Sequence, residues 1–412
     1  MPRRYQLSNN IEVITERIPH FKSATIGVWI RAGSVNETRD INGVSHLLEH
    51  LFFKGTRTRT ARQISEALEG MGGTANAFTS REYTCIYART LDSHIDVAME
   101  LLADVLLNST FRDVEKEKTV IAEEIQSYID TPDEHVHDML CSVIWRRHSL
   151  GFPITGSKKG LAALSRKTVK DYYKRWYVPS NVIVAAAGGF NNNALRDLIE
   201  THFSGLSGSG NRHAYDAPTI RAAKKIYPRR IGQTHLCIGL PGVRANDKKR
   251  YAVNLLANIL GGSSISRLYQ RVREDEGLAY QVNSFLSSFE NTGMIGVYAA
   301  LGPRQTQKAF DIIIEEMASL KKKKVPNDEL QTAKEQLKGS IVLSLESTSG
   351  RMMRLARSVC TLGRVENLKT IMNKIDAVTS EEIRELAREL FLNEALNVVA
   401  LGPLKKLQLR EL

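Results

Sequence analysis

His46, Glu49 and His50 form an H-x-x-E-H motif within residues 43–53. If this segment is a helix, the two histidines lie one turn apart on the same face. Two imidazoles placed in this way can hold one metal ion, most often zinc, and Glu49 can then act as general base toward a water molecule. The flanking residues are apolar, so the helix should be largely buried, where unpaired polar side chains are costly. The motif therefore predicts a catalytic metal site.

A catalytic zinc site needs a third protein ligand, and the best candidate lies in the charged stretch 113–125. The spacing of its apolar residues predicts a helix. Glu117 and Glu124 are seven residues apart, so they share one face of that helix, two turns apart. We expect Glu124 to be the third ligand and Glu117 to be the hydrogen-bond partner of a ligating histidine. Glu123, rotated by about 100° from Glu124, is the alternative ligand.

The elements that must position these residues follow a similar pattern in both halves of the chain. In the first half we expect two strands, the motif helix, a helix at 61–71, a strand pair at 74–90, further helices and a strand at 181–187. In the second half we expect a strand at 234–240, a helix at 248–260, a strand pair at 280–300, further helices and a strand at 396–402. This repetition predicts an α+β fold with two homologous lobes, each a sheet with a helical layer.

The same repetition predicts the domain boundaries. The first lobe covers residues 1–206, a linker rich in glycine and serine falls within 207–221, and the second lobe covers 222–412. The helix at 248–260 takes the place of the motif helix but contains no histidine. We therefore expect the first lobe alone to be catalytic.

With these motifs, the chain resembles the pitrilysin/insulysin family of zinc peptidases, the inverzincins. It is most similar to the β subunit of mitochondrial processing peptidase and its short bacterial relatives. The resemblance extends over nearly the whole chain and rests on the motif, on Glu124 with Glu117 seven residues before it, and on the stretches 50–56 and 72–84. It implies one zinc ion per chain, cleavage of extended peptides, and two lobes that form a clamshell around a chamber.

The resemblance also implies which residues contact the substrate. The stretch after the second helix should end in an edge strand whose free backbone groups pair with an extended peptide. There, Asn76 and Ala77 should bind the peptide backbone, with Phe78 near a side-chain pocket. Arg273 and Tyr280, seven residues apart in the second half, should reach the same substrate. Guanidinium and hydroxyl groups can hold a carbonyl oxygen or stabilise a tetrahedral oxyanion.

Glu134 and Asp138 follow the ligand helix and would share one helix face. They stand where the β subunit of the processing peptidase carries acidic residues that hold a substrate arginine. A carboxylate pair can receive a guanidinium group. The resemblance therefore implies a preference for arginine near the cleaved bond, and a solvated acidic face is the alternative interpretation.

A competing hypothesis is a non-catalytic structural or partner subunit of a complex similar to the processing peptidase. Such members typically lose motif residues, whereas all five positions are intact here. The glycine-containing stretch 261–266 is also shorter than the glycine-rich loop of the α subunit. Besides its peptide substrate, we expect the chain to pair with a second copy as a homodimer, with a homologous subunit in a heterodimer as the alternative.

Composition argues against several other classes. The net charge is +12, but the basic residues are dispersed, and the densest run, 321–324, is typical of a solvated helix end, so no nucleic-acid partner is expected. The sequence contains no run of eighteen apolar residues, which a membrane helix would need. Its N-terminus lacks an apolar signal region. These features predict a cytoplasmic protein if the source is bacterial, or an organelle-matrix protein if it is eukaryotic. The four scattered cysteines predict reduced, mostly buried thiols.

Overall fold

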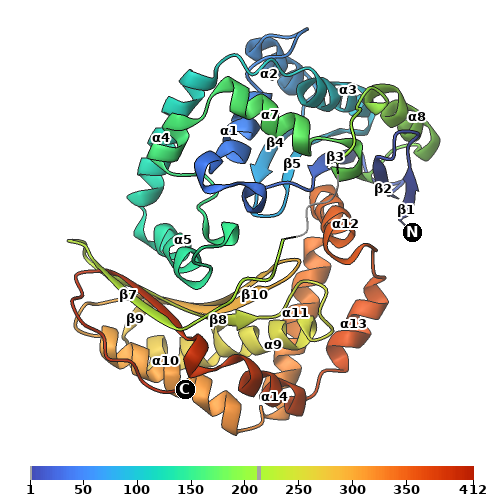
Figure 1. The fold of residues 1–412 in the computed structure, drawn as a ribbon. Helices are drawn as coiled ribbons and strands as arrows, with labels where there is room; N and C mark the ends of the chain where they lie inside the picture. Colours follow the sequence, from blue (N-terminus) through green and yellow to red (C-terminus); the bar gives the residue numbers. More distant parts are fainter. Residues whose placement is uncertain (1, 211–214) are drawn as a thin grey trace. The chain divides into compact units, whose positions relative to one another are not determined.

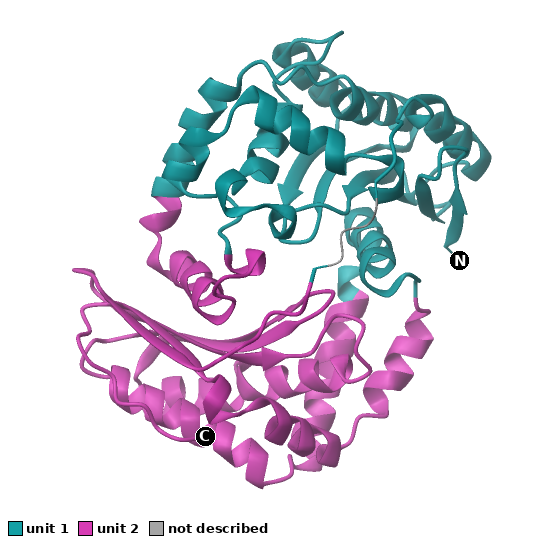
Figure 2. Cartoon of the chain, in the orientation of Figure 1, with its two compact units in different colours: residues 1–126, 152–215, 343–365 teal, residues 127–151, 216–342, 366–412 magenta. Residues whose placement is uncertain are grey.

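The computed structural model describes residues 2–210 and 215–412, which form two compact units, each with its own sheet (Figure 1). Unit 1 consists of residues 1–126, 152–215 and 343–365, and unit 2 of residues 127–151, 216–342 and 366–412 (Figure 2). Residues 211–214, which belong to the predicted linker, lie outside the described residues. The prediction of two lobes that each combine a sheet with helices is confirmed.

Unit 1 contains a six-stranded sheet with the order β1-β2-β6-β3-β5-β4, so β4 is an edge strand. Only the pair of β2 and β6 is parallel. Its strands are β1 (Arg3–Gln6), β2 (Glu12–Arg17), β3 (Ser23–Ile30), β4 (Thr74–Thr79), β5 (Thr84–Leu91) and β6 (Val182–Gly188). Its helices are α1 (Val44–Phe52), α2 (Ala61–Gly70), α3 (Ile95–Leu107), α4 (Val114–Ile129), α6 (Lys158–Ala163), α7 (Arg166–Trp176), α8 (Asn192–Phe203) and α12 (Thr348–Leu362). Of these, α4 continues beyond Gln126 into unit 2.

Unit 2 contains a five-stranded sheet with the order β7-β11-β8-β10-β9, in which only the pair of β7 and β11 is parallel. Apart from β1, this arrangement repeats that of unit 1. Its strands are β7 (Ala223–Pro228), β8 (Thr234–Gly242), β9 (Ala279–Ser288), β10 (Gly293–Leu301) and β11 (Asn397–Gly402). Its helices are α5 (Pro132–Ile144), α9 (Arg250–Gly261), α10 (Thr306–Lys322), α11 (Asn327–Ser344), α13 (Leu368–Asp376) and α14 (Ser380–Leu390), with a π-helical turn at Tyr269–Asp275.

The two units exchange one helix each. The helix α12 comes from the second half of the chain but packs on β2, β3 and β6 of unit 1, whereas α5 comes from the first half and packs on β8 and β11 of unit 2. Figure 2 shows α12 in the colour of unit 1 and α5 in the colour of unit 2. The compact units therefore differ from the predicted halves, 1–206 and 222–412, at the segments 127–151 and 343–365. An amphipathic pattern reveals the apolar face of a helix but not the sheet that will cover it.

Corresponding glycines allow the exchanged helices to approach their sheets closely. A Cβ atom on Gly27 of β3 would lie 2.7 Å from the Met352 Sδ of α12. A Cβ atom on Gly239 of β8 would lie 3.0 Å from the Leu140 Cδ2 of α5. The two glycines lie in equivalent strands, and each follows an isoleucine. Both sheets therefore accommodate the exchanged helix in the same way.

Alternating strand residues face the exchanged helix and the helical layer. In unit 1, Ile183 and Ala185 of β6 share a buried cluster with Met352 and Leu355 of α12. In unit 2, Leu236 of β8 belongs to a different, larger cluster that includes residues of α9, α10 and α14. Both faces of each sheet are therefore covered, which explains why the central strands are almost continuously apolar.

Candidate metal centre

The start of α1 is fixed by a buried carboxylate. Glu37 accepts hydrogen bonds from the backbone N–H groups of Gly43 at 2.8 Å and Ser45 at 2.9 Å, and from Asn42 Nδ2 at 2.8 Å. Gly43 precedes the helix with φ of +97°, a conformation that favours glycine, and no side chain of its own caps the helix. Burial raises the pKa of Glu37 to about 7, although its hydrogen-bond donors oppose this rise. Glu37 thus holds the first turn of the helix that carries the motif.

A second contact fixes the same turn from α7. Ser45 Oγ lies 2.8 Å from the hydroxyl oxygen of Tyr172, and that hydroxyl donates to the Gly33 carbonyl at 3.2 Å. The leucines of α1, which share one side of the helix, are fully buried, as the apolar flanks of the motif predicted. The helix therefore has little freedom to rotate, and the directions of His46 and His50 are set by the fold.

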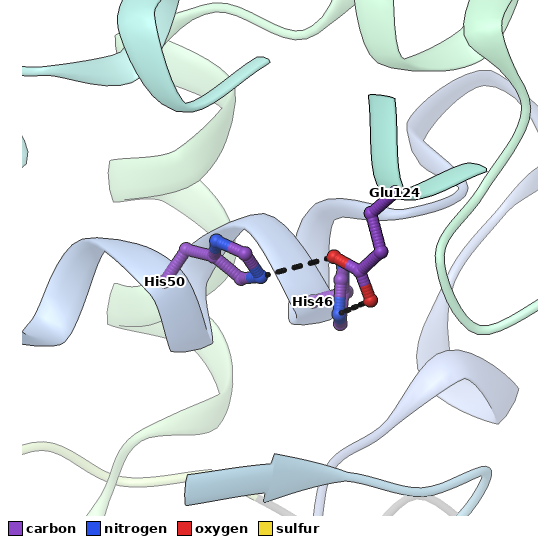
Figure 3. A group of neighbouring side chains, drawn as sticks. All are labelled: His46, His50 and Glu124. Atoms are coloured by element: carbon purple, nitrogen blue, oxygen red, sulfur yellow. Dashed lines mark ion pairs between the residues drawn. The ribbon is translucent and has the colours of Figure 1, made fainter. Parts of the chain in front are cut away.

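The structure brings together His46 and His50 of α1 and Glu124 of α4 (Figure 3). The Nε2 atoms of His46 and His50 each lie 3.5 Å from a different carboxylate oxygen of Glu124. One ligand atom from each residue lies within 4.8 Å of the others, and this is the one such group of metal-binding side chains in the described part of the chain. Glu123, the alternative ligand, is not part of it.

The pKa shifts of His46 and Glu124 favour the forms that bind a metal ion, whereas that of His50 favours the protonated form, whose proton a metal ion would have to displace. Burial lowers the pKa of His46 to about 4, so its imidazole is neutral at neutral pH. A hydrogen bond with His50 lowers the pKa of Glu124, which keeps the carboxylate ionised. Burial opposes the charged form of His50, but its bonds to Glu124 and Glu117 outweigh burial and raise its pKa. Neutral imidazoles and ionised carboxylates are the forms that bind metal, and this donor set of two nitrogens and one oxygen fits zinc.

Glu117 contacts His50 from the side away from Glu124. Its Oε2 lies 3.3 Å from His50 Nδ1, and its other oxygen lies 3.1 Å from the Lys54 ammonium group. Glu117 is fully buried, and Ile121 is buried between Glu117 and Glu124 on α4. The predicted contact between Glu117 and a histidine of the motif is therefore present in the structure. Lys54 was not among the candidate residues.

Glu49 faces the edge strand of the sheet. Its carboxylate accepts a hydrogen bond from the hydroxyl group of Thr79 on β4. Burial raises the pKa of Glu49, and the bond from Thr79 and the proximity of His50 oppose this rise. A raised pKa makes a carboxylate a stronger base toward a bound water molecule than an ordinary carboxylate is.

The other predicted residues of β4 lie on or near the free edge of the sheet. Asn76 is exposed, and its side-chain oxygen accepts a hydrogen bond from the Ala77 backbone N–H at 2.8 Å. Phe78 points to the opposite sheet face from Thr79, because side chains alternate along a strand. There its ring lies 5.5 Å from that of Trp29, a residue that also contacts α12. Phe78 thus belongs to an aromatic group on the face of the sheet that α12 covers.

Arg273 and Tyr280 lie together in unit 2. The Arg273 guanidinium carbon is 5.7 Å from the centre of the Tyr280 ring and 4.7 Å from that of Tyr269. Tyr280, near the start of the edge strand β9, is 78% exposed. Both predicted residues are therefore available to a ligand of unit 2, whereas the metal-binding group belongs to unit 1.

Glu134 and Asp138 lie on α5 and also belong to unit 2. They are four residues apart on this helix, as predicted, and Glu134 is exposed. The neighbouring His137 turns toward the sheet, where its ring lies 4.7 Å from that of Phe285.

Two further predictions concern the cysteines and the helices. All four cysteines are buried and form no disulfide, as predicted. None of the helices among residues 2–210 and 215–412 is long and apolar enough to cross a membrane.

Three residues around the site were not predicted from the sequence to have a role there. Lys54 had a usable signal, because it follows the motif helix and its charge is opposite to that of a buried glutamate. Thr79 and Glu37 had none, because their roles depend on how a strand and a loop approach α1 in three dimensions.

Comparison with known proteins identifies the family. The model described as "Insulinase (Peptidase family M16)" matches residues 12–158, and that described as "Peptidase M16 inactive domain" matches residues 163–337. A Bacillus subtilis (strain 168) protein named as an uncharacterized zinc protease is 42% identical over 393 residues, or 95% of this chain and 96% of that protein. A probable mitochondrial-processing peptidase subunit beta of Arabidopsis thaliana is 30% identical over 417 residues, or 97% of this chain and 78% of that protein.

Solved structures agree on the fold. A protease from Helicobacter pylori matches with a TM-score of 0.92 at 22% identity, over 98% of this chain and 99% of that chain. A Pseudomonas fluorescens structure described as a peptidase M16 inactive domain has the same TM-score at 18% identity, over the full length of both chains. The relatives named as zinc proteases support a peptidase role, as the resemblance implied. On the family models and the full-length relatives together, the chain belongs to peptidase family M16.

Proposed function

We propose that this chain is a zinc-dependent endopeptidase that cleaves extended peptides at the metal-binding group of unit 1. The observation that carries the proposal is the convergence of His46, His50 and Glu124, with the Glu49 carboxylate on the same helix and beside the edge strand. The names of the relatives support the same reaction class.

His46, His50 and Glu124 would hold one zinc ion. When bound, zinc polarises the scissile carbonyl group and makes a water molecule more acidic. Three protein ligands leave a fourth position open to water or substrate, as catalytic zinc sites require. This count supports a catalytic site rather than a structural one.

Glu49 would move the protons of the reaction. As general base, its carboxylate takes a proton from the attacking water, and the same carboxyl group returns a proton to the leaving amine. The bond from the Thr79 hydroxyl group holds this carboxylate in place. Glu49 is thus proposed as the catalytic residue that acts directly on the reacting atoms.

The peptide would add to the free edge of β4. An edge strand offers unpaired backbone groups to an extended chain, and Asn76 and Ala77 stand on this edge. Since pairing through the backbone does not depend on side chains, it supports a substrate class of unfolded or extended peptides. Arg273 and Tyr280 of unit 2 are proposed to contact the substrate as well, as the resemblance implies.

Glu134 and Asp138 are proposed to favour substrates with an arginine near the cleaved bond. The exposure of Glu134 and the shared helix face support this specificity. The double variant Glu134→Gln with Asp138→Asn should lower cleavage of peptides that contain arginine more than cleavage of matched peptides without it. An unchanged ratio between the two peptides would remove these residues from the proposal.

The proposed function is tested by Glu49→Gln, with Glu123→Gln as the control that removes an equivalent charge outside the metal-binding group. We expect Glu49→Gln to bind zinc as the wild type does and to lose peptide cleavage, while Glu123→Gln keeps both. Equal turnover of wild type and Glu49→Gln would contradict the role of Glu49. A wild-type chain that binds zinc but cleaves no peptide in a diverse library would favour the alternative of a non-catalytic partner subunit.

A further inference from the structure

Lys54 is a partly exposed residue that contacts the metal-binding group through Glu117. It stands just after α1, where its backbone N–H donates to the Leu51 carbonyl at 3.2 Å. Its ammonium group lies 3.1 Å from one carboxylate oxygen of Glu117, and the other oxygen of Glu117 lies 3.3 Å from His50 Nδ1. Lys54, Glu117 and His50 therefore form a continuous chain of contacts.

Glu117, the middle residue of these contacts, needs a compensating charge. The Glu117 side chain is 0% exposed, and a buried carboxylate without a compensating charge is strongly destabilising. The Lys54 side chain is 37% exposed, so it stays partly in contact with water while its ammonium group lies beside the buried carboxylate. Lys54 is thus the counter-charge that allows Glu117 to stay behind His50.

Glu117 in turn determines how His50 faces the metal-binding group. A carboxylate beside Nδ1 favours the tautomer with the proton on Nδ1 and leaves Nε2 free as a ligand. That Nε2 is the atom that lies 3.5 Å from Glu124. His46 differs, because its buried Nδ1 has no hydrogen-bond partner among the described residues. Of the two histidines, His50 is the one whose orientation depends on a chain of charged residues.

From this geometry we infer that Lys54 is a positioning residue for the metal ligand His50 and acts through Glu117. The inference rests on the proposed zinc site and extends it by one residue that touches neither the metal nor the substrate. Removing a group that orients a ligating histidine typically weakens metal affinity by about 10- to 100-fold. The same range is expected for loss of the Lys54 ammonium group.

The test compares Lys54→Met, Lys54→Arg and the control Lys116→Met, which removes the same charge from an exposed position on α4. Zinc affinity is measured by competition with a chromophoric chelator, and the thermal unfolding of each zinc-free protein is recorded alongside. We expect Lys54→Met to bind zinc about 10- to 100-fold more weakly. Lys54→Arg should recover most of the affinity, and Lys116→Met should match the wild type. The zinc-free Lys54→Met protein should unfold cooperatively, so that the loss of affinity is not a loss of fold.

A double-mutant cycle then tests the route through Glu117. In the background of Glu117→Gln, Lys54→Met should cause no further loss of zinc affinity, because the carboxylate on which it acts is gone. An equal loss in both backgrounds would overturn the inference, as would wild-type affinity in Lys54→Met. If the wild-type chain itself binds no zinc, the proposed function fails, and the inference about Lys54 fails with it. A wild type that binds zinc alongside an unaffected Lys54→Met variant overturns the inference alone.

Discussion

The helices α1 and α9 hold corresponding places in two units of matching strand order, yet only α1 carries reactive side chains. Each packs against the edge strand of its own sheet, α1 against β4 and α9 against β9. The residues of α1 include two histidines and a glutamate, whereas α9 contains no histidine and no carboxylate. The same scaffold thus supports a metal-binding group in one unit and simple packing in the other.

The contact with the edge strand shows how this difference arises. In unit 1, the hydroxyl group of Thr79 donates to the Glu49 side chain. In unit 2, the hydroxyl group of Ser284 donates to the backbone carbonyl of Ala257. A Cβ atom on Gly261, at the end of α9, would lie only 2.6 Å from the backbone nitrogen of Ser284. Small residues allow α9 to pack closely against β9, whereas the Glu49 carboxylate of α1 contacts β4.

The two helices also begin differently. A carboxylate, Glu37, accepts the first backbone N–H groups of α1. In α9, Arg250 at the first position pairs with Glu366, which also accepts from Lys374 at 2.5 Å and from the Tyr251 hydroxyl group at 3.0 Å. The first turn of α9 is thus held by a salt bridge to Glu366, which follows α12 in the chain, whereas α1 begins on a carboxylate that accepts its backbone N–H groups.

The largest contrast should appear when one polar side chain is removed from each helix. We expect His46→Ala to abolish zinc binding and peptide cleavage, because a catalytic zinc site cannot lose one of three protein ligands. Asn254→Ala on α9 should change neither, since Asn254 donates only to the Arg250 carbonyl of its own helix. Metal analysis and peptide cleavage of both variants check this contrast, and it breaks down if both variants retain zinc.

The next largest effect concerns stability at acid pH in unit 2. Burial opposes ionisation of Glu366, but its bonds from Lys374, Arg250 and Tyr251 outweigh burial and lower its pKa to about 2. Because the pKa in the folded state lies below the ordinary value, this carboxylate stabilises the fold above pH ~4.5, and the contribution disappears as the pH falls toward ~2. Its full size is about 3 kcal/mol. Glu366→Gln should therefore lower the free energy of unfolding at pH 7 by about that amount, and much less at pH 2.

Urea titrations at both pH values measure this difference. A Glu366→Gln variant with the same loss at pH 2 as at pH 7 would mean that the network stabilises unit 2 by packing rather than by charge.

A smaller effect tests the exchanged helices. Gly27→Ala should lower the free energy of unfolding by about 1–3 kcal/mol, because the added Cβ atom would meet the fully buried Trp29 ring at 2.9 Å as well as Met352 of α12 at 2.7 Å. Gly239→Ala should cost less, because its contact with Leu140 is 3.0 Å. Denaturant titration of the two variants ranks them. The reverse order would show that α5, not α12, lies under greater steric constraint.

The smallest effect compares the two edge-strand hydroxyl groups. Thr79→Val removes the donor to Glu49 and should slow peptide cleavage about tenfold, because a hydrogen bond to a charged group contributes ~1.5 kcal/mol or more. Ser284→Ala removes a donor to a backbone carbonyl in unit 2 and should leave the cleavage rate unchanged. Steady-state cleavage of one peptide by both variants checks this. Equal slowing in the two variants would assign the effect to stability instead of to Glu49.

The strands and helices, and the grouping of His46, His50 and Glu124, could largely be predicted from the sequence, because each depends on local patterns. The spacing of His46 and His50 and of Glu117 and Glu124 follows from the pitch of a helix. The helix at 248–260 was expected without ligands, and α9 has none. These properties are contained in short segments.

What could not be predicted depends on distant segments. The two repeated halves of the sequence suggested two domains with one boundary between them. In the structure, α5 and α12 each belong to the unit formed mainly by the other half, because an amphipathic helix can pack on either sheet. Similarly, Glu37 caps α1 across a loop, and Thr79 reaches Glu49 from a strand thirty residues away. Such contacts require the tertiary fold.

The most direct test of a hydrolytic metal site confined to unit 1 is peptide cleavage by the wild-type chain measured together with its zinc content. We expect about one zinc ion per chain from a set of three ligands, loss of cleavage when a chelator removes it, and recovery when zinc is restored. Cleavage that continues at the same rate in the metal-free chain would exclude zinc-dependent hydrolysis at His46, His50 and Glu124.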